Sequence, residues 1–99
     1  MIENYVVTTT PVVGIKTVTA TAAEIFAGAS ALSGRKLLAI KNTDHALRIR
    51  FGSNAISQTS GHILEPLATV EIPFETLVPV PIYAISEGAS VTVEVWESK

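Results

Sequence analysis

The sequence predicts a single all-β domain, a small β-sandwich or barrel of about seven to eight short antiparallel strands. Several short runs alternate between apolar and polar residues, a period of two that turns one face of a strand to a core and the other to water. These runs are separated by Gly, Pro, Asn and Ser, which favour turns. With 99 residues, of which 47% are hydrophobic, the chain is long enough for one core. We expect an N-terminal arm that can be flexible over residues 1–11 and a β-sandwich domain over residues 12–99.

The N-terminal region predicts an arm followed by an edge strand. Tyr5-Val6-Val7 could form a short strand in the arm, but Pro11 follows, and proline cannot donate a hydrogen bond to a β-ladder. Val12–Thr19 alternates imperfectly, as expected of a strand at the edge of a sheet. Its two sides carry Val13, Ile15 and Thr17 on one and Gly14, Lys16 and Val18 on the other.

The segment Thr21–Leu32 supports two structures, a short strand and a short helix. Thr21 and Glu24 have the spacing of a capping box, and the many alanines agree with a helix. The strong β character of the preceding threonines favours a strand. We expect a short strand around Glu24–Phe26, followed by a loop of small residues that ends at Gly34.

The centre of the chain predicts a β-hairpin with a loop of about four residues. Two apolar runs, Leu37–Ile40 and Ala46–Phe51, flank a polar cluster, residues 42–45. Asn and Asp favour such turns because their short side chains hydrogen-bond the nearby backbone. In the second run, apolar residues expected in the core alternate with arginines expected in water. The apolar residues are Leu47, Ile49 and Phe51, and the arginines are Arg48 and Arg50.

Four further strands are expected after this hairpin, bounded by proline, glycine and polar residues. Between two of them, Glu75–Pro81 contains two prolines and predicts an extended connection. The four expected strands are Ile63–Pro66, Ala68–Phe74, Ile82–Ser86 and Ser90–Trp96. The predicted core consists of Leu38, Ile40, Leu47, Ile49, Phe51, Val70, Ile72, Ile82, Ala84, Val91, Val93 and Val95.

Composition and charge limit the partners that the chain can have. Only 16% of the residues are charged and the formal net charge is −2, too balanced for a basic face that binds nucleic acid. There is no cysteine, which excludes disulfides and thiolate metal sites. No apolar run approaches the roughly 20 residues that span a bilayer, and the first residues do not resemble a signal peptide. Glu71 and Glu94 are expected on solvent faces, where they would pair across strands with Arg48 and Arg50.

Residues that could support catalysis or metal binding are few and scattered. His45 and His62 lie in expected loops, and together with Asp44 and Glu65 they could bind a metal only if two distant loops met. Solvated loop residues are the interpretation that we favour. Many serines are present, but none occupies the Gly-x-Ser-x-Gly elbow of a hydrolase. We expect no enzymatic activity, no catalytic or cofactor-binding residue, no metal and no cofactor.

Trp96 is the residue whose predicted position invites a functional interpretation. In the last strand Val91, Val93 and Val95 alternate with residues that include Trp96, which places the indole on the face opposite the core. Such a tryptophan can close the end of the sandwich against the arm, anchor a protein interface, or form a platform for a sugar. We assign a candidate interface to Tyr5, Val6, Val7 and Trp96.

Ser33–Asn42 and Leu47–Gly52 read as a "grkLlaIkN" strand, a short turn and a strand that closes on Phe-Gly. This combination resembles small structural proteins of tailed bacteriophages. Gly61–Pro66 is similar to a "G-x-x-L-x-P-G" turn, although Leu67 stands in place of the final glycine. Val80–Ile85 resembles a "v-p-i-y-a-i" strand that precedes a small-residue turn and a final Val-rich strand.

This resemblance implies a non-enzymatic virion protein, made in the cytoplasm of the host bacterium. Such proteins serve as capsid decoration proteins, as base domains of head fibres, or as neck and tail components. A small sandwich without stalk, collagen-like repeat or coiled coil favours a capsid decoration (cement) protein. Its partners would be the major capsid protein or another virion protein, and it would form a homo-oligomer without nucleic acid or membrane. The alternative from another class is a carbohydrate-binding sandwich that presents Trp96, Tyr83 or Tyr5 to glycans.

Overall fold

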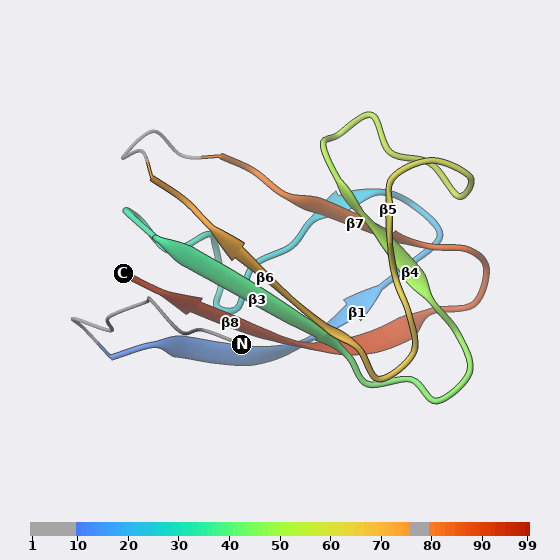
Figure 1. The fold of residues 1–99 in the computed structure, drawn as a ribbon, viewed down its shortest axis with the longest axis horizontal. Helices are drawn as coiled ribbons and strands as arrows, with labels where there is room; N and C mark the ends of the chain where they lie inside the picture. Colours follow the sequence, from blue (N-terminus) through green and yellow to red (C-terminus); the bar gives the residue numbers. More distant parts are fainter. Residues whose placement is uncertain (1–9, 76–79) are drawn as a thin grey trace.

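The computed structural model describes residues 10–75 and 80–99, which form two antiparallel sheets packed face to face (Figure 1). The first sheet has the strand order β1-β8-β3-β6 and the second has the order β2-β7-β4-β5. The first sheet comprises β1 (Val12–Val18), β8 (Val91–Ser98), β3 (Leu37–Asn42) and β6 (Thr69–Pro73). The second comprises β2 (Ala23–Glu24), β7 (Tyr83–Ser86), β4 (Ile49–Gly52) and β5 (His62–Leu64). The predicted small all-β sandwich is confirmed.

The strand β8 lies inside the first sheet, between β1 and β3, and pairs antiparallel with both. Its alternation is the clearest in the chain: Val91, Val93 and Val95 are each at most 1% exposed and face the second sheet. The edge-strand prediction for Val12–Thr19 is also confirmed, because β1 pairs with β8 and lies at the end of the strand order.

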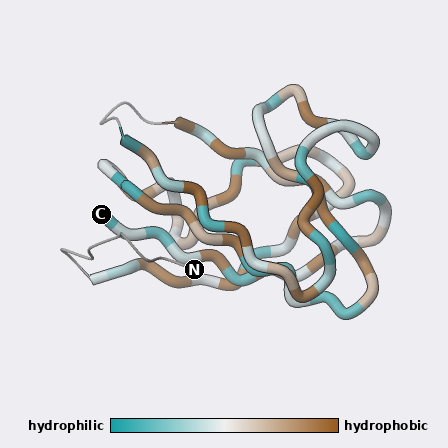
Figure 2. Tube along the Cα trace, viewed as in Figure 1, coloured by the Kyte–Doolittle hydropathy of each residue, from teal (hydrophilic) through white to brown (hydrophobic). Residues whose placement is uncertain are grey.

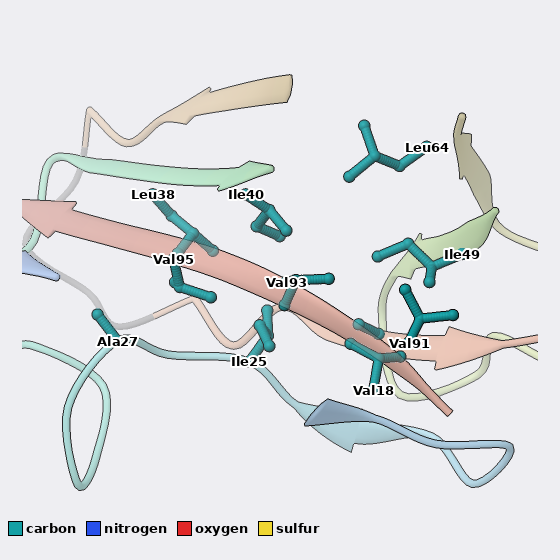
Figure 3. Close-up of a cluster of buried hydrophobic side chains, with 11 residues drawn as sticks. Val18, Ile25, Ala27, Leu38, Ile40, Ile49, Leu64, Val91, Val93 and Val95 are labelled. Carbon is teal, nitrogen blue, oxygen red and sulfur yellow. The ribbon is translucent and has the colours of Figure 1, made fainter. Parts of the chain in front are cut away.

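The core fills the space between the two sheets, and both contribute side chains to it (Figure 3). Figure 2 shows the apolar and polar stretches that alternate along the strands. Of the predicted core, only Leu47 is wrong: it is 41% exposed. The buried cluster also includes residues that the alternation did not reveal, namely Val18, Ile25, Ala27 and Leu64.

The predicted hairpin between the two central runs is wrong, because β3 and β4 belong to different sheets. β3 pairs with β6 and β8, whereas β4 pairs with β5 and β7. The side chain of Asn42, at the end of β3, is fully buried and donates to the carbonyl oxygens of Leu47 and Leu64 at 2.9 and 3.2 Å. Its own oxygen accepts the N–H of Asp44. These bonds stabilise a connection over residues 43–48 that crosses from one sheet to the other and carries Leu47 into solvent.

The ambiguous segment after β1 contains a short strand, β2, and the described residues contain no helix. The strand lies slightly earlier than predicted: β2 is Ala23–Glu24, so only Glu24 of the predicted range Glu24–Phe26 belongs to it. Beyond β2 the chain turns inward, and Ile25 and Ala27 are buried. Its backbone passes so close to β1 that a Cβ added at Gly14 would lie 2.0 Å from the carbonyl oxygen of Ala27. Gly14 therefore permits this segment to cover the inner face of β1. No helix in the described part of the chain is long and apolar enough to cross a membrane.

Candidate assembly surface

The outer face of the first sheet carries exposed apolar side chains on the edge strand β1. Val13 is 61% exposed and Ile15 is 72% exposed, the highest values among the large apolar side chains of the described residues. The reason is the alternation of the strand: Gly14 and Lys16 face inward, so their neighbours must face outward. Thr17 is the third residue on this side, so the outer face of β1 carries no charge.

The register of the sheet places these residues beside Trp96. Val13 lies opposite Trp96 of β8, and Trp96 lies opposite Ala39 of β3. The next outward row consists of Ile15, Glu94 and Lys41. We call Val13, Ile15, Ala39 and Trp96 the outer patch. An aromatic side chain among apolar neighbours, with charged residues beside it, is typical of a protein interface.

Trp96 is partly buried and lies on the face opposite the core, as predicted. Its indole N–H donates to the hydroxyl of Ser98 at 3.2 Å, so the ring system lies along its own strand. Because this bond satisfies the N–H, the indole contributes apolar ring surface to the outer patch. Tyr83 lies on β7 in the other sheet, so the structure does not bring these two aromatic residues into one sugar platform.

The remaining predicted interface residues, Tyr5, Val6 and Val7, lie outside the described residues. Comparison with known proteins gives no family. No protein-family model, curated protein or solved structure matches the chain. The likeness to bacteriophage structural proteins therefore stays a prediction that depends on the short motifs alone.

The histidines and carboxylates considered for metal binding have structural roles or lie in solvent. Asp44 accepts the backbone N–H groups of Ala46 and Leu47, both at 2.7 Å, and these bonds hold the pKa of its carboxyl below the ordinary value. His62 packs on the ring of Phe51, with 5.5 Å between ring centroids. Within residues 10–75 and 80–99, no three His, Asp or Glu side chains form a group that could hold a metal ion.

The surface arginines pair with a carboxylate other than the ones predicted. Arg48 and Arg50 donate through Nε to the two oxygens of Glu87, at 2.9 and 2.8 Å. The hydrogen bond from Arg48 is the main reason why the pKa of Glu87 lies below its ordinary value. The predicted pairing with Glu71 and Glu94 is wrong because those residues lie on β6 and β8 of the opposite sheet. This error follows from the incorrect hairpin.

A buried ion pair, which sequence reasoning missed, connects the loop before β3 to the end of β8. Arg35 Nη1 lies 2.6 Å from Glu97 Oε2, and the side chains are 6% and 0% exposed. Glu97 also accepts the backbone N–H groups of Ala27 and Leu32, at 2.8 and 3.1 Å. Arg35 in turn donates to the carbonyl oxygen of Val80 at 2.8 Å. This network fixes the loop that covers one end of the core.

The signal for this network is present in the sequence. The alternation that turns Val91, Val93 and Val95 inward continues to residue 97, so a glutamate there must face the core. A buried carboxylate needs a cation or several donors, and an arginine on a nearby loop is the simplest source. The arginine also lies with its guanidinium carbon 5.0 Å from the centre of the Phe74 ring, which the sequence alone does not indicate.

Proposed function

We propose that this chain is a non-enzymatic virion structural protein of a tailed bacteriophage, which decorates the capsid by binding the major capsid protein. The observation that supports the proposal best is the outer patch, where the two most exposed large apolar side chains of the described residues lie beside Trp96. Soluble monomers rarely leave such side chains grouped, and grouped ones mark interaction surfaces. The motifs that resemble those of bacteriophage structural proteins are the reason for proposing the major capsid protein as the partner.

The arrangement of the charged residues supports an assembly role as well. The buried pair of Arg35 and Glu97 is fully engaged with the backbone, and Glu87 is engaged with two arginines. These groups stabilise the sandwich. In the outer patch, by contrast, the side chains of Val13 and Ile15 are largely exposed and contribute little to the core.

Rebinding to capsids tests this proposal. Val13→Glu and Trp96→Ala should each weaken binding to capsids stripped of the protein, Trp96→Ala by about 2 kcal/mol or roughly thirtyfold in Kd if it is a central anchor. Ile63→Glu is the matched control, since Ile63 is 43% exposed on an edge strand of the other sheet. Both test variants should keep the circular dichroism of the parent. If they bind like the parent, the outer patch is not the capsid contact.

The position of the protein in purified particles separates the virion roles. A decoration protein should be present in numbers comparable to the major capsid protein, which quantitative mass spectrometry can measure. A few copies at one vertex would instead indicate a neck, tail or head-fibre base component. If the protein is absent from particles and binds a glycan array through Trp96, the virion role is contradicted and a carbohydrate-binding module is favoured.

A further inference from the structure

We infer that two copies of this chain pair through β1, antiparallel and about a two-fold axis at Ile15, so that the first sheet continues from one copy into the other. The inference rests on the assembly role proposed above, and it names a second copy of the chain as the partner of the β1 edge. β1 is the longest edge strand: it spans 7 residues, whereas β6, β2 and β5 at the other edges span 5, 2 and 3. A long edge offers the most backbone hydrogen bonds to an added strand.

This edge is suited to accept a strand. Among the described residues, β1 pairs on one side only, with β8 (Figure 1). Val12–Val18 contains no proline, so each residue retains its N–H donor, whereas β6 ends at Pro73. An inward-pointing charge on an edge strand, such as Lys16, can prevent another strand from pairing with that edge. However, Lys16 donates to the carbonyl oxygen of Gly28 and lies 4.8 Å above the centre of the Phe26 ring, so its charge is already engaged.

The sequence of β1 is compatible with its own reversal, which a two-fold interface requires. When Val12–Val18 is reversed about its central residue, Ile15 lies opposite Ile15 of the second copy, and Val13 lies opposite Thr17. Both outward pairs are uncharged. Lys16, the only charged residue of the strand, falls opposite Gly14 of the second copy and not opposite another lysine. This register therefore uses the full strand without a like-charge pair.

Charges on the neighbouring strand do not oppose the pairing. Glu94 lies opposite Ile15 on β8, so the two copies of Glu94 would be separated by three strand spacings, about 14 Å. That distance exceeds the screening length of about 8 Å at physiological ionic strength. The continuous outer face would instead join the exposed side chains of Val13 and Ile15 from both copies, with a Trp96 on either side.

Disulfide trapping tests the register directly, because the natural chain has no cysteine. Ile15→Cys should form a covalent dimer under mild oxidation, since directly opposed residues of antiparallel strands have Cα atoms about 4.5–5.5 Å apart, within the range of a disulfide. Thr17→Cys alone should form no disulfide-linked dimer, but it should form one when it is mixed with Val13→Cys. Ile63→Cys, on the edge strand β5, controls for random collision. The inference is wrong if Ile15→Cys gives no more dimer than Ile63→Cys.

A charge substitution tests the same edge without crosslinking. Ile15→Lys places two ammonium groups opposite each other and should weaken dimerisation in solution by about tenfold or more, measured by sedimentation equilibrium. Ile63→Lys should leave dimerisation unchanged. At a protein concentration where the parent is monomeric, both variants should unfold at the urea concentration of the parent. If the parent is monomeric at all concentrations while Ile15→Lys still loses capsid binding, this edge binds capsid protein and not a second copy. That result would overturn the inference and leave the proposed function standing.

Discussion

Removal of the carboxylate of Glu97 should destabilise the sandwich more than any surface change, because three donors would lose their acceptor at once. The carboxylate is fully buried and accepts from Arg35 and from the backbone of Ala27 and Leu32. Breaking a buried ion pair by removing one partner costs about 3–5 kcal/mol. A domain of this size has a free energy of unfolding of about 5–15 kcal/mol. Glu97→Ala should therefore remove a large share of the stability.

The effect is measurable by urea denaturation and by thermal unfolding. At about 4–8 °C per kcal/mol for a domain of 60–100 residues, the loss of about 3–5 kcal/mol in Glu97→Ala should lower Tm by roughly 12–40 °C. Glu97→Gln retains one acceptor oxygen and should fall between the parent and Glu97→Ala. A loss of less than about 1 kcal/mol in Glu97→Ala would refute the burial and the donor set that we describe.

A double-mutant cycle separates the ion pair from the rest of the network. Arg35→Met keeps an apolar stem near Phe74 but leaves the Glu97 carboxylate without its cation, so it should also cost several kcal/mol. The double variant Arg35→Met, Glu97→Met should be clearly more stable than the sum of the single losses predicts, because no buried charge is left unpaired. Strict additivity would mean that the two side chains do not act together.

The remaining predictions concern two backbone positions and one surface carboxylate. Gly14→Ala should lower the free energy of unfolding, measured by urea denaturation, by about 2–3 kcal/mol, because the added Cβ would lie 2.0 Å from the carbonyl oxygen of Ala27. Gly88→Ala is the control: nothing lies within 4 Å of its added Cβ, so the stability should change by less than about 0.5 kcal/mol. Leu67→Gly should raise the urea concentration at the unfolding midpoint. Leu67 has a φ of 63°, a strained conformation for leucine, and glycine relieves about 1 kcal/mol of this strain. Because Leu67 is 52% exposed, the contacts that its side chain loses are few. Because the pKa of Glu87 is lower in the folded protein, its carboxylate stabilises the fold above its ordinary pKa of 4.5, and this stabilisation is lost as the pH falls through the pKa of the folded state. Glu87→Gln should therefore flatten the pH dependence of the urea midpoint below about pH 4.5. An unchanged slope in that variant would remove Glu87 from the acid transition.

The sequence predicted which face of each strand is buried far better than which strands are neighbours. Alternation determines the two sides of a strand locally, and the inward side predicted for the last strand is correct, since Val91, Val93 and Val95 are buried in β8. It contains no information about the partner across the ladder, so a connection over residues 43–48 is compatible both with a hairpin and with a crossing between sheets. The hydrogen bonds from Asn42 to Leu47 and Leu64 favour the crossing, and one of these partners is far away in the sequence. Such tertiary bonds are not visible in a pattern of period two.

The same distinction, between the faces of single strands and the pairing of strands, applies to the outer patch. The outward position of Trp96 followed from alternation alone. Which side of β1 faces outward, and the adjacency of Val13 and Trp96 through the register between β1 and β8, are supplied only by the structure. The buried pair of Arg35 and Glu97 was missed for the opposite reason. Residue 97 lies inside the period of the last strand, but the predicted strand ends at Trp96, so the prediction does not include Glu97.

The residues that carry the bacteriophage resemblance serve the fold, and this explains why they specify a function poorly. Arg35 and Asn42 lie just before β3 and at its end, and both are buried polar residues that bind distant backbone: Arg35 binds Val80, and Asn42 binds Leu64. Arg35 fixes the loop before β3 and Asn42 fixes the connection after it, so both side chains serve the fold whatever the protein binds. The most exposed apolar side chains of the described residues lie on β1, before the resemblance begins at Ser33. Selection on the fold and selection on the partner can therefore act on different residues, and substitutions of the exposed side chains of Val13 and Ile15 should change binding without a change in the sandwich.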